Sequence, residues 1–227
     1  MPALGGVGRE AFLKSLVEPF IIYLVLFFPD FMSPPLPAPL EGAAIPFSLV
    51  REAARIVAYN GPSLLLLWYL IFTRRGEPGR RILPRISGGD VQAFFVSLPG
   101  LLAIGLGISL VLPFFAGAAG TFTLEAPSSA AGWAVVFLSC LSTGYLEETY
   151  FRYYLLSRFA APGVKFLAVL CSTALFALCH FYEGLWGVLN AFFAGLLLAL
   201  VYLRYGALHG IAWAHGVYNA IVYLTGI

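Results

Sequence analysis

The chain has 227 residues, of which 60% are hydrophobic and only 11% are charged, and its formal net charge is +2. Ordinary soluble domains carry about 25% charged residues, so the composition excludes a typical soluble domain and predicts a polytopic membrane protein. The small net charge gives no support to nucleic-acid binding.

Seven apolar runs follow one another along the chain and predict an all-α bundle of about seven transmembrane helices. The first run is interpreted as a retained span, because no small-residue cleavage site follows it. Five prolines between positions 29 and 39 exclude a helix there. Gly206 is expected to stop the sixth helix. The expected spans are about 11–28, 56–72, 91–115, 133–158, 166–180, 185–203 and 208–224.

Basic residues predict the orientation of the bundle. Five arginines lie in loop 74–85, which places that loop on the cytoplasmic side. With alternating spans, the N-terminus also falls inside, and the C-terminus and loops 29–50 and 116–131 fall outside. Arg51 and Arg55 are the basic residues that disagree with this scheme, and a re-entrant segment would change the span count.

The fourth span contains Glu147, Glu148 and Arg152. Charges inside a membrane cost several kcal/mol on even the lenient insertion scales, so we expect them to pair in the protein interior. Glu148 and Arg152 are four residues apart, on one helix face, and are predicted to form an ion pair. Glu147 is rotated by about 100° and is expected to be less fully paired. The alternative is an ion pair that only holds two helices together.

All three histidines lie in the last third of the chain. His180 follows Phe176 by four residues, and Asn219 follows His215 by four, so each pair is expected to share a helix face. At 1.5 Å per residue, these polar residues and Glu147 lie about 12–22 Å from the cytoplasmic ends of their spans. The fourth, fifth and seventh helices are therefore predicted to surround a polar cavity near the middle of the bilayer.

The remaining polar residues have simpler interpretations. His209 is expected at the membrane interface, and Glu183 in a solvated loop. Asn190 is as consistent with a structural hydrogen bond between helices as with a role in the site. No CxxC or HExxH metal motif is present. The odd number of cysteines and their apolar surroundings argue against a disulfide framework and favour core positions for Cys140, Cys171 and Cys179.

Such a set of residues can catalyse hydrolysis. A glutamate and a histidine can hold a water molecule and remove its proton. A second histidine and an amide can donate hydrogen bonds to the oxyanion of a tetrahedral intermediate. No serine or cysteine is placed as a nucleophile, and Cys179 is discounted because neighbours on a helix diverge.

Three motifs resemble those of the CPBP intramembrane protease family, which includes the CAAX prenyl endopeptidases of the Rce1 type and relatives linked to bacteriocin self-immunity. The motifs are Glu147-Glu148-x-x-x-Arg152, Phe176-x-x-x-His180 and His215-x-x-x-Asn219. The resemblance covers about residues 131–225. It implies that Glu147 is the base and that His180 holds the water. It also implies that Glu148 and Arg152 orient the site and balance its charge, and that His215 and Asn219 bind the oxyanion.

The resulting expectation is a multi-pass membrane protein, in the plasma membrane or a bacterial inner membrane. Residues 1–130 supply spans without recognised motifs, and residues 131–227 form the catalytic core of one membrane domain. The expected partners are the bilayer and a protein or peptide substrate that is cleaved near the membrane. A Glu/His cluster can also bind zinc, and we favour the metal-free mechanism. The alternatives are a transporter that uses the buried carboxylates and a non-catalytic immunity or scaffold protein of the same family.

Overall fold

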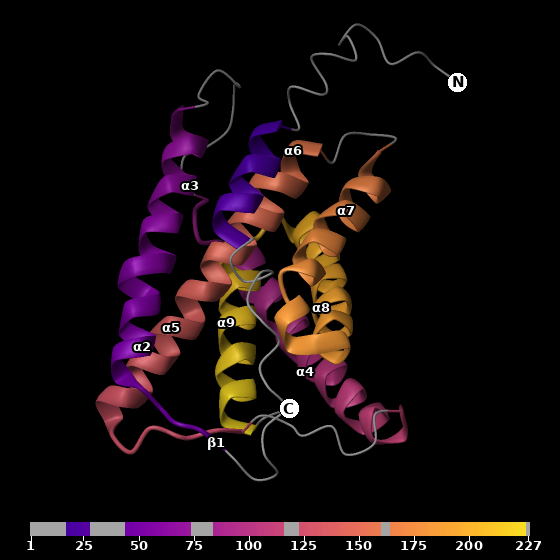
Figure 1. The fold of residues 1–227 in the computed structure, drawn as a ribbon. Coiled ribbons are helices and arrows are strands. Elements are labelled where there is room, and N and C mark those ends of the chain that lie inside the picture. Colours follow the sequence, from indigo (N-terminus) through magenta and orange to yellow (C-terminus); the bar gives the residue numbers. More distant parts are fainter. Residues whose placement is uncertain (1–16, 28–43, 74–83, 116–122, 160–163, 226–227) are drawn as a thin grey trace, which may run out of the picture.

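The computed structural model of the chain describes residues 17–27, 44–73, 84–115, 123–159 and 164–225. These residues form an all-α bundle (Figure 1), apart from one parallel pairing between the two-residue strands β1 (Ala44–Ile45) and β2 (Thr123–Leu124). The helical segments are Val17–Phe27, α2 (Leu49–Ala54), η1 (Arg55–Asn60), α3 (Gly61–Thr73), α4 (Gly88–Phe115), α5 (Ala130–Glu148), η2 (Thr149–Leu156), α6 (Ser157–Phe159), α7 (Lys165–Leu178), η3 (Phe181–Glu183), α8 (Gly184–Tyr205) and α9 (Leu208–Thr225).

Short polar side chains begin several of these helices. Ser129 precedes α5, and its hydroxyl accepts a hydrogen bond from the amide of Gly132 at 3.1 Å. Ser48 caps α2 in the same way. Before α4, the amide of Ser87 donates to the Asp90 carboxylate at 2.8 Å, while the Asp90 amide donates to the Ser87 carbonyl. Each cap satisfies amides that have no partner within the helix.

Four helical segments are long and apolar enough to cross a membrane: Leu49–Thr73, Gly88–Val111, Ala130–Leu156 and Phe181–Tyr205. Two shorter apolar helices, Val17–Phe27 and Lys165–Leu178, stand beside them. Large apolar side chains also remain on the outer surface, including Val57, Phe95, Phe114 and Phe166, which are all exposed. An exterior of this kind suits lipid rather than water, so the chain is an integral membrane protein.

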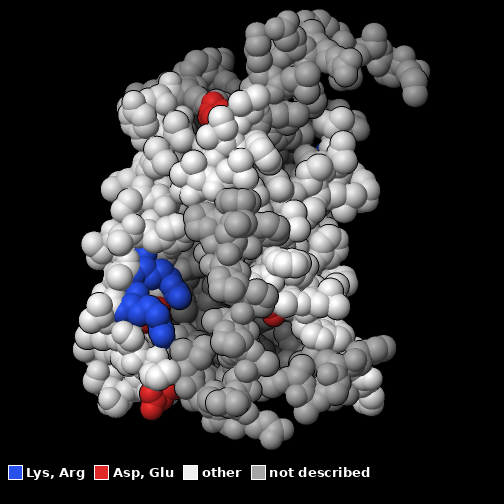
Figure 2. All heavy atoms as spheres, viewed as in Figure 1, with Lys and Arg blue, Asp and Glu red and all other residues white. Residues whose placement is uncertain are grey.

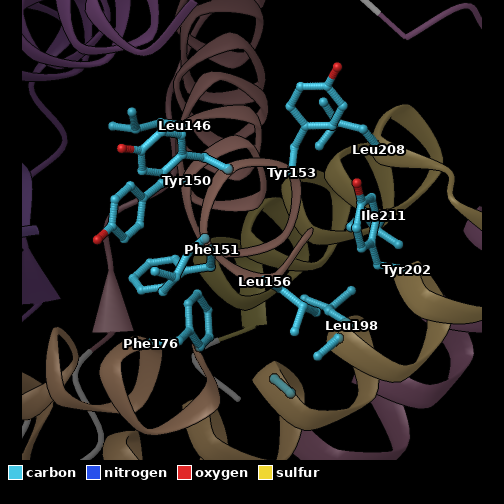
Figure 3. Close-up of a cluster of buried hydrophobic side chains, with 14 of the residues drawn as sticks. Leu146, Tyr150, Phe151, Tyr153, Leu156, Phe176, Leu198, Tyr202, Leu208 and Ile211 are labelled. Atoms are coloured by element: carbon cyan, nitrogen blue, oxygen red, sulfur yellow. The ribbon is translucent and has the colours of Figure 1, made fainter. Parts of the chain in front are cut away.

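Helix α9 runs through the middle of the bundle and packs most extensively against α5 and α4, while α7 packs against α8 (Figure 1). An aromatic core surrounds η2 (Figure 3), where the rings of Phe151 and Phe176 meet edge to face at 5.2 Å. The helix Val17–Phe27 joins this core, because the Tyr150 hydroxyl donates to the carbonyl of Pro19 at 2.7 Å. The core therefore fixes η2 and α7 relative to each other.

The all-α prediction is confirmed, and the predicted helices appear in the predicted order with three differences. The second helix begins at Leu49 instead of about residue 56, because Ser48 caps it and Arg51 and Arg55 lie within it. The fourth contains a π-helical segment, η2, directly after Glu148. The fifth ends at Leu178, two residues before His180. Gly206 ends α8 with a left-handed conformation (φ 63°), as predicted. Most of loop 74–85 lies outside the described residues.

Candidate active site

The site forms where α5 and α9 cross in close contact. A Cβ atom on Gly144 of α5 would lie 2.8 Å from the carbonyl oxygen of Ala212 and 2.9 Å from the amide nitrogen of Gly216. A Cβ on Gly216 would in turn lie 2.7 Å from the Cα of Leu141. Small residues let helix backbones approach in this way. Because these glycines lie next to the motif residues in sequence, the crossing brings the end of α5 against the middle of α9.

Glu148 and Arg152 form a fully buried ion pair. The Arg152 Nε lies 3.2 Å from the Glu148 Oε2, and both side chains are 0% exposed. The other end of the guanidinium is also held, since its Nη2 donates to the carbonyl of Gly195 on α8 at 3.0 Å. The guanidinium also stacks 4.5 Å from the centroid of the Phe176 ring. Arg152 thus balances the charge of a carboxylate and links η2, α7 and α8.

His215 stands between the two glutamates. Its Nδ1 lies 2.9 Å from the Glu148 Oε1, and its Nε2 lies 3.5 Å from the Glu147 Oε2. Because a carboxylate can only accept a hydrogen bond, Nδ1 carries a proton and donates it to Glu148. The orientation of the imidazole is thereby fixed, with Nε2 directed towards Glu147.

Glu147 has a different environment from its neighbour. Its side chain is 13% exposed, whereas that of Glu148 is fully buried. The Glu147 Oε2 is nevertheless buried, and it has no hydrogen-bond partner among the described residues. A buried carboxylate oxygen without a partner costs free energy, unless water or substrate supplies the hydrogen bond. The Glu148 Oε2 also lacks a hydrogen bond among the described residues, but it lies 3.2 Å from the Arg152 guanidinium. Glu147 has no such cation and is partly exposed, so of the two carboxylates it is the more accessible to a reacting molecule.

His180 lies beyond the end of α7 but stays close to Phe176. Its Nδ1 lies 2.9 Å from the carbonyl oxygen of Phe176, so this nitrogen carries the proton and Nε2 remains an acceptor. The Phe176 ring borders both histidines, with centroid distances of 4.8 Å to His180 and 5.8 Å to His215. No hydrogen bond or ion pair joins His180 to Glu147 within the part of the chain that the structure describes.

Cys179 comes closer to His180 than the sequence predicted, with 3.7 Å between its Sγ and the His180 Nδ1. The prediction assumed that both residues continue a helix, and α7 ends before them. The thiol lies 3.0 Å from the carbonyl oxygen of Phe176, to which it donates. Because that carbonyl also holds the His180 Nδ1, the contact does not form a Cys–His nucleophile pair.

Of the other predicted polar residues, Asn219 lies near the site, whereas Asn190 and His209 make contacts outside it. Asn219 lies one turn after His215, is partly buried, and has no hydrogen-bond partner among the described residues. Asn190 pairs with the hydroxyl of Tyr218 at 3.1 Å, which is the structural bond that the sequence left open. His209 lies 3.0 Å from the hydroxyl of Tyr145 and therefore belongs to a separate contact.

The sequence analysis did not single out the glycines that allow this geometry. Gly144 and Gly216 allow the close helix crossing. The carbonyl of Gly195 accepts a hydrogen bond from Arg152, and the absence of a side chain leaves room for the Phe176 ring, from which a Cβ would lie only 2.8 Å away. Two of these glycines could have been found from their positions in the sequence, because Gly144 lies within one turn of Glu147 and Gly216 directly follows His215. Among the described residues, no group of three or more His, Cys, Asp or Glu side chains is arranged to hold a metal ion.

Comparison with known families supports the motif analysis. Residues 129–221 match the model of a family described as type II CAAX prenyl endopeptidase Rce1-like. This range contains all the residues of the site described above. No curated protein and no solved structure gives a significant match to the chain.

Proposed function

We propose that this chain, whose residues 129–221 belong to the Rce1-like family, is an intramembrane endopeptidase that uses a glutamate as its base. The observation that carries the proposal is the chain of contacts Arg152–Glu148–His215–Glu147, which ends on a buried carboxylate oxygen with no hydrogen-bond partner among the described residues. Three members of this chain hold one another in place. The fourth has an oxygen that can accept a hydrogen bond from water.

In the proposed mechanism, Glu147 removes a proton from a water molecule, which then attacks the carbonyl carbon of a peptide bond. When the tetrahedral intermediate collapses, the C–N bond breaks, and Glu147 returns the proton to the leaving amine nitrogen. His180, whose Nε2 can accept a hydrogen bond, helps to hold that water. Asn219 donates its amide to the oxyanion, because no described residue bonds to that amide. With its Nδ1 proton donated to Glu148, His215 can donate from Nε2 to the same oxyanion only when the ring carries a second proton, and the proposed mechanism assigns it that form. Glu148 with Arg152 keeps the ring in position.

We propose a metal-free reaction. Arg152 already supplies the positive charge next to Glu148, and His215 spends its Nδ1 proton on the same carboxylate. A chelator is therefore expected to leave the cleavage rate unchanged. Loss of activity with a chelator, restored by added zinc, would move the reaction to the metal-dependent class.

The substrate is proposed to be a protein or peptide with its scissile bond close to the membrane, through processing of a CAAX-type C-terminus or cleavage of a sorting tail or precursor. The test compares protein termini in membranes that contain the wild type or Glu147→Gln. The wild type should produce new termini near predicted spans or lipid anchors, and Glu147→Gln should not. Identical termini in both samples, at equal expression, would contradict an endopeptidase and favour a scaffold.

A further inference from the structure

A second set of buried polar side chains lies between α5 and the segment formed by α2 and η1. Glu52 of α2 is 2% exposed, and the hydroxyl of Ser139 on α5 donates to its Oε2 at 2.9 Å. Arg51 and Arg55 approach the same carboxylate at 3.3 and 3.4 Å. The charge of Glu52 is therefore balanced at the point where α2 meets α5.

The two arginines connect this buried carboxylate with the surface. Their side chains are 39% and 47% exposed, although Glu52 beneath them is buried. Figure 2 shows a group of Lys and Arg atoms over this part of the molecule, at the surface near the start of α2. The polar cluster of Glu52, Arg51 and Arg55 therefore reaches the protein surface at the N-terminal end of the helical segment Leu49–Thr73, where a candidate membrane span begins.

Hydrogen bonds continue from this cluster along α5. The amide of Asn60, the last residue of η1, donates to the Ser142 hydroxyl at 2.7 Å and the Thr143 hydroxyl at 3.0 Å. The Ser142 hydroxyl donates to the carbonyl of Ser139 at 2.8 Å. Polar groups thus follow one another without a break from Glu52 to Thr143.

Thr143 leads directly to the candidate active site. It lies four residues before Glu147 in α5, so the two side chains share one helix face about one turn apart. Ser142, Thr143 and Glu147 all keep part of their surface exposed, although they lie among packed helices. Solvent-sized molecules therefore reach these side chains.

Helix packing alone does not account for this arrangement. Hydrogen bonds between helices explain the Glu52–Ser139 and Asn60–Ser142 contacts. However, the Asn60 Oδ1 is buried and has no hydrogen-bond partner among the described residues. Buried amide oxygens of this kind are satisfied by ordered water where the site is polar. The Asn60 amide protons are donated to the two hydroxyls of α5, so its Oδ1 and the remaining capacity of those hydroxyls supply the two to four partners that a bound water needs.

We propose that Asn60, Ser142 and Thr143 bind water, and that the polar face from Glu52 to Glu147 is the route by which water reaches the active site. This inference rests on the proposed hydrolytic function, because each cleaved peptide bond consumes one water molecule. The hydrocarbon core of a membrane holds no water to supply it. Polar side chains within spans commonly mark such pathways.

Hydration of the site can be measured without any substrate. The chain contains three asparagines, at positions 60, 190 and 219. In proteoliposomes with ¹⁵N-labelled asparagine, water-edited solid-state NMR should transfer magnetisation rapidly from water to the side-chain amide of Asn60. Asn190 is partly exposed, so its amide provides the internal reference for a side chain that water reaches, whereas Asn60 is buried at 0% exposure. An Asn60 signal that builds up more slowly than that of Asn190 would overturn the inference. This outcome is independent of catalysis, so it is distinct from failure of the proposed function.

The kinetic test uses two substitutions at one position. Thr143→Val keeps the shape of the side chain and removes the hydroxyl, whereas Thr143→Ser keeps the hydroxyl. Thr143→Val should lower kcat about tenfold, the scale of one lost water-mediated contact, with KM unchanged. Thr143→Ser should retain the wild-type kcat. Ser97→Ala, which removes a buried hydroxyl from α4, is the control and should also retain it. A wild-type kcat in Thr143→Val would contradict the proposed water route. If that variant does not fold, the NMR measurement of Asn60 hydration tests the proposal instead.

Discussion

At the scale of single residues, two adjacent carboxylates have unequal surroundings. Glu148 is held by Arg152 on one oxygen and by His215 on the other. Glu147 faces the Nε2 of His215 at a longer distance, 3.5 Å, and keeps one oxygen without a hydrogen-bond partner among the described residues. A rotation of about 100° between neighbours on a helix is enough to give the two carboxylates these different surroundings.

Arg152→Ala is expected to destabilise the protein as well as inactivate it. The substitution leaves Glu148 fully buried next to a cavity and without its cation, and breaking a buried pair in this way costs about 3–5 kcal/mol. Melting temperatures of the purified protein should fall clearly. Arg204→Ala is the matched control, because Arg204 is exposed at the end of α8 and should have little effect. Equal melting temperatures for the two variants would contradict the buried ion pair.

At the scale of helices, the crossing of α5 and α9 decides whether the proposed catalytic groups meet. The atoms nearest to a new Cβ on Gly144 or Gly216 are mostly backbone atoms. A methyl group at either position could therefore not be accommodated by moving a flexible side chain. A wider separation of the helices would move His215 away from both glutamates. The glycines therefore hold His215 close to Glu147 and Glu148 in the candidate site.

Gly216→Ala is expected to reduce the cleavage rate and the melting temperature, because the helices must separate to admit the methyl group. The control is Gly107→Ala on α4, where a Cβ would meet nothing within 4 Å. That substitution should be neutral or slightly stabilising, since alanine favours a helix interior by about 1 kcal/mol over glycine. Cleavage rates and melting temperatures are measured for both variants, so that an effect of Gly216→Ala on the rate can be compared with its effect on stability. An unchanged rate in Gly216→Ala would show that the close crossing is not required.

The order and approximate limits of the helices were predictable because long apolar runs determine them. The start of α2 was not, because Arg51 and Arg55 resemble loop residues until Glu52 is seen to be buried between them. The motif spacing predicted the Glu148–Arg152 pair correctly. It could not predict that His215 bonds to Glu148, since this contact depends on how closely α5 approaches α9. Contacts between helices depend on packing, which a pattern along one helix does not contain.

At the scale of the whole molecule, an apolar exterior encloses charged groups that form ion pairs with one another. Four helical segments are long enough to cross the membrane, and Glu148, Arg152 and His215 lie buried among them. Glu148 pairs with Arg152 of the same helical segment and with His215 of α9, as expected for ionisable groups inside a membrane. This arrangement makes a site for hydrolysis within the bilayer physically reasonable.

Loop 74–85 is predicted to face the cytoplasm because it contains five arginines. A cysteine at position 79, introduced as Gly79→Cys in a background without the three native cysteines, should be labelled only after the cells are permeabilised. The position lies outside the described residues, so the expectation rests on the charge distribution. Efficient labelling from outside intact cells would contradict this prediction and show that the bundle has the opposite orientation in the membrane.

The most direct test of the account is the cleavage rate of Glu147→Gln, measured with purified protein in liposomes and a peptide that the wild type cleaves. Glutamine keeps the size of the side chain and removes its basic group. The substitution also removes a charge from the membrane interior, so the fold should persist. The account predicts an unchanged melting temperature and a rate reduced by roughly 10²–10⁴, the usual contribution of a general base. A wild-type rate in folded Glu147→Gln would contradict it.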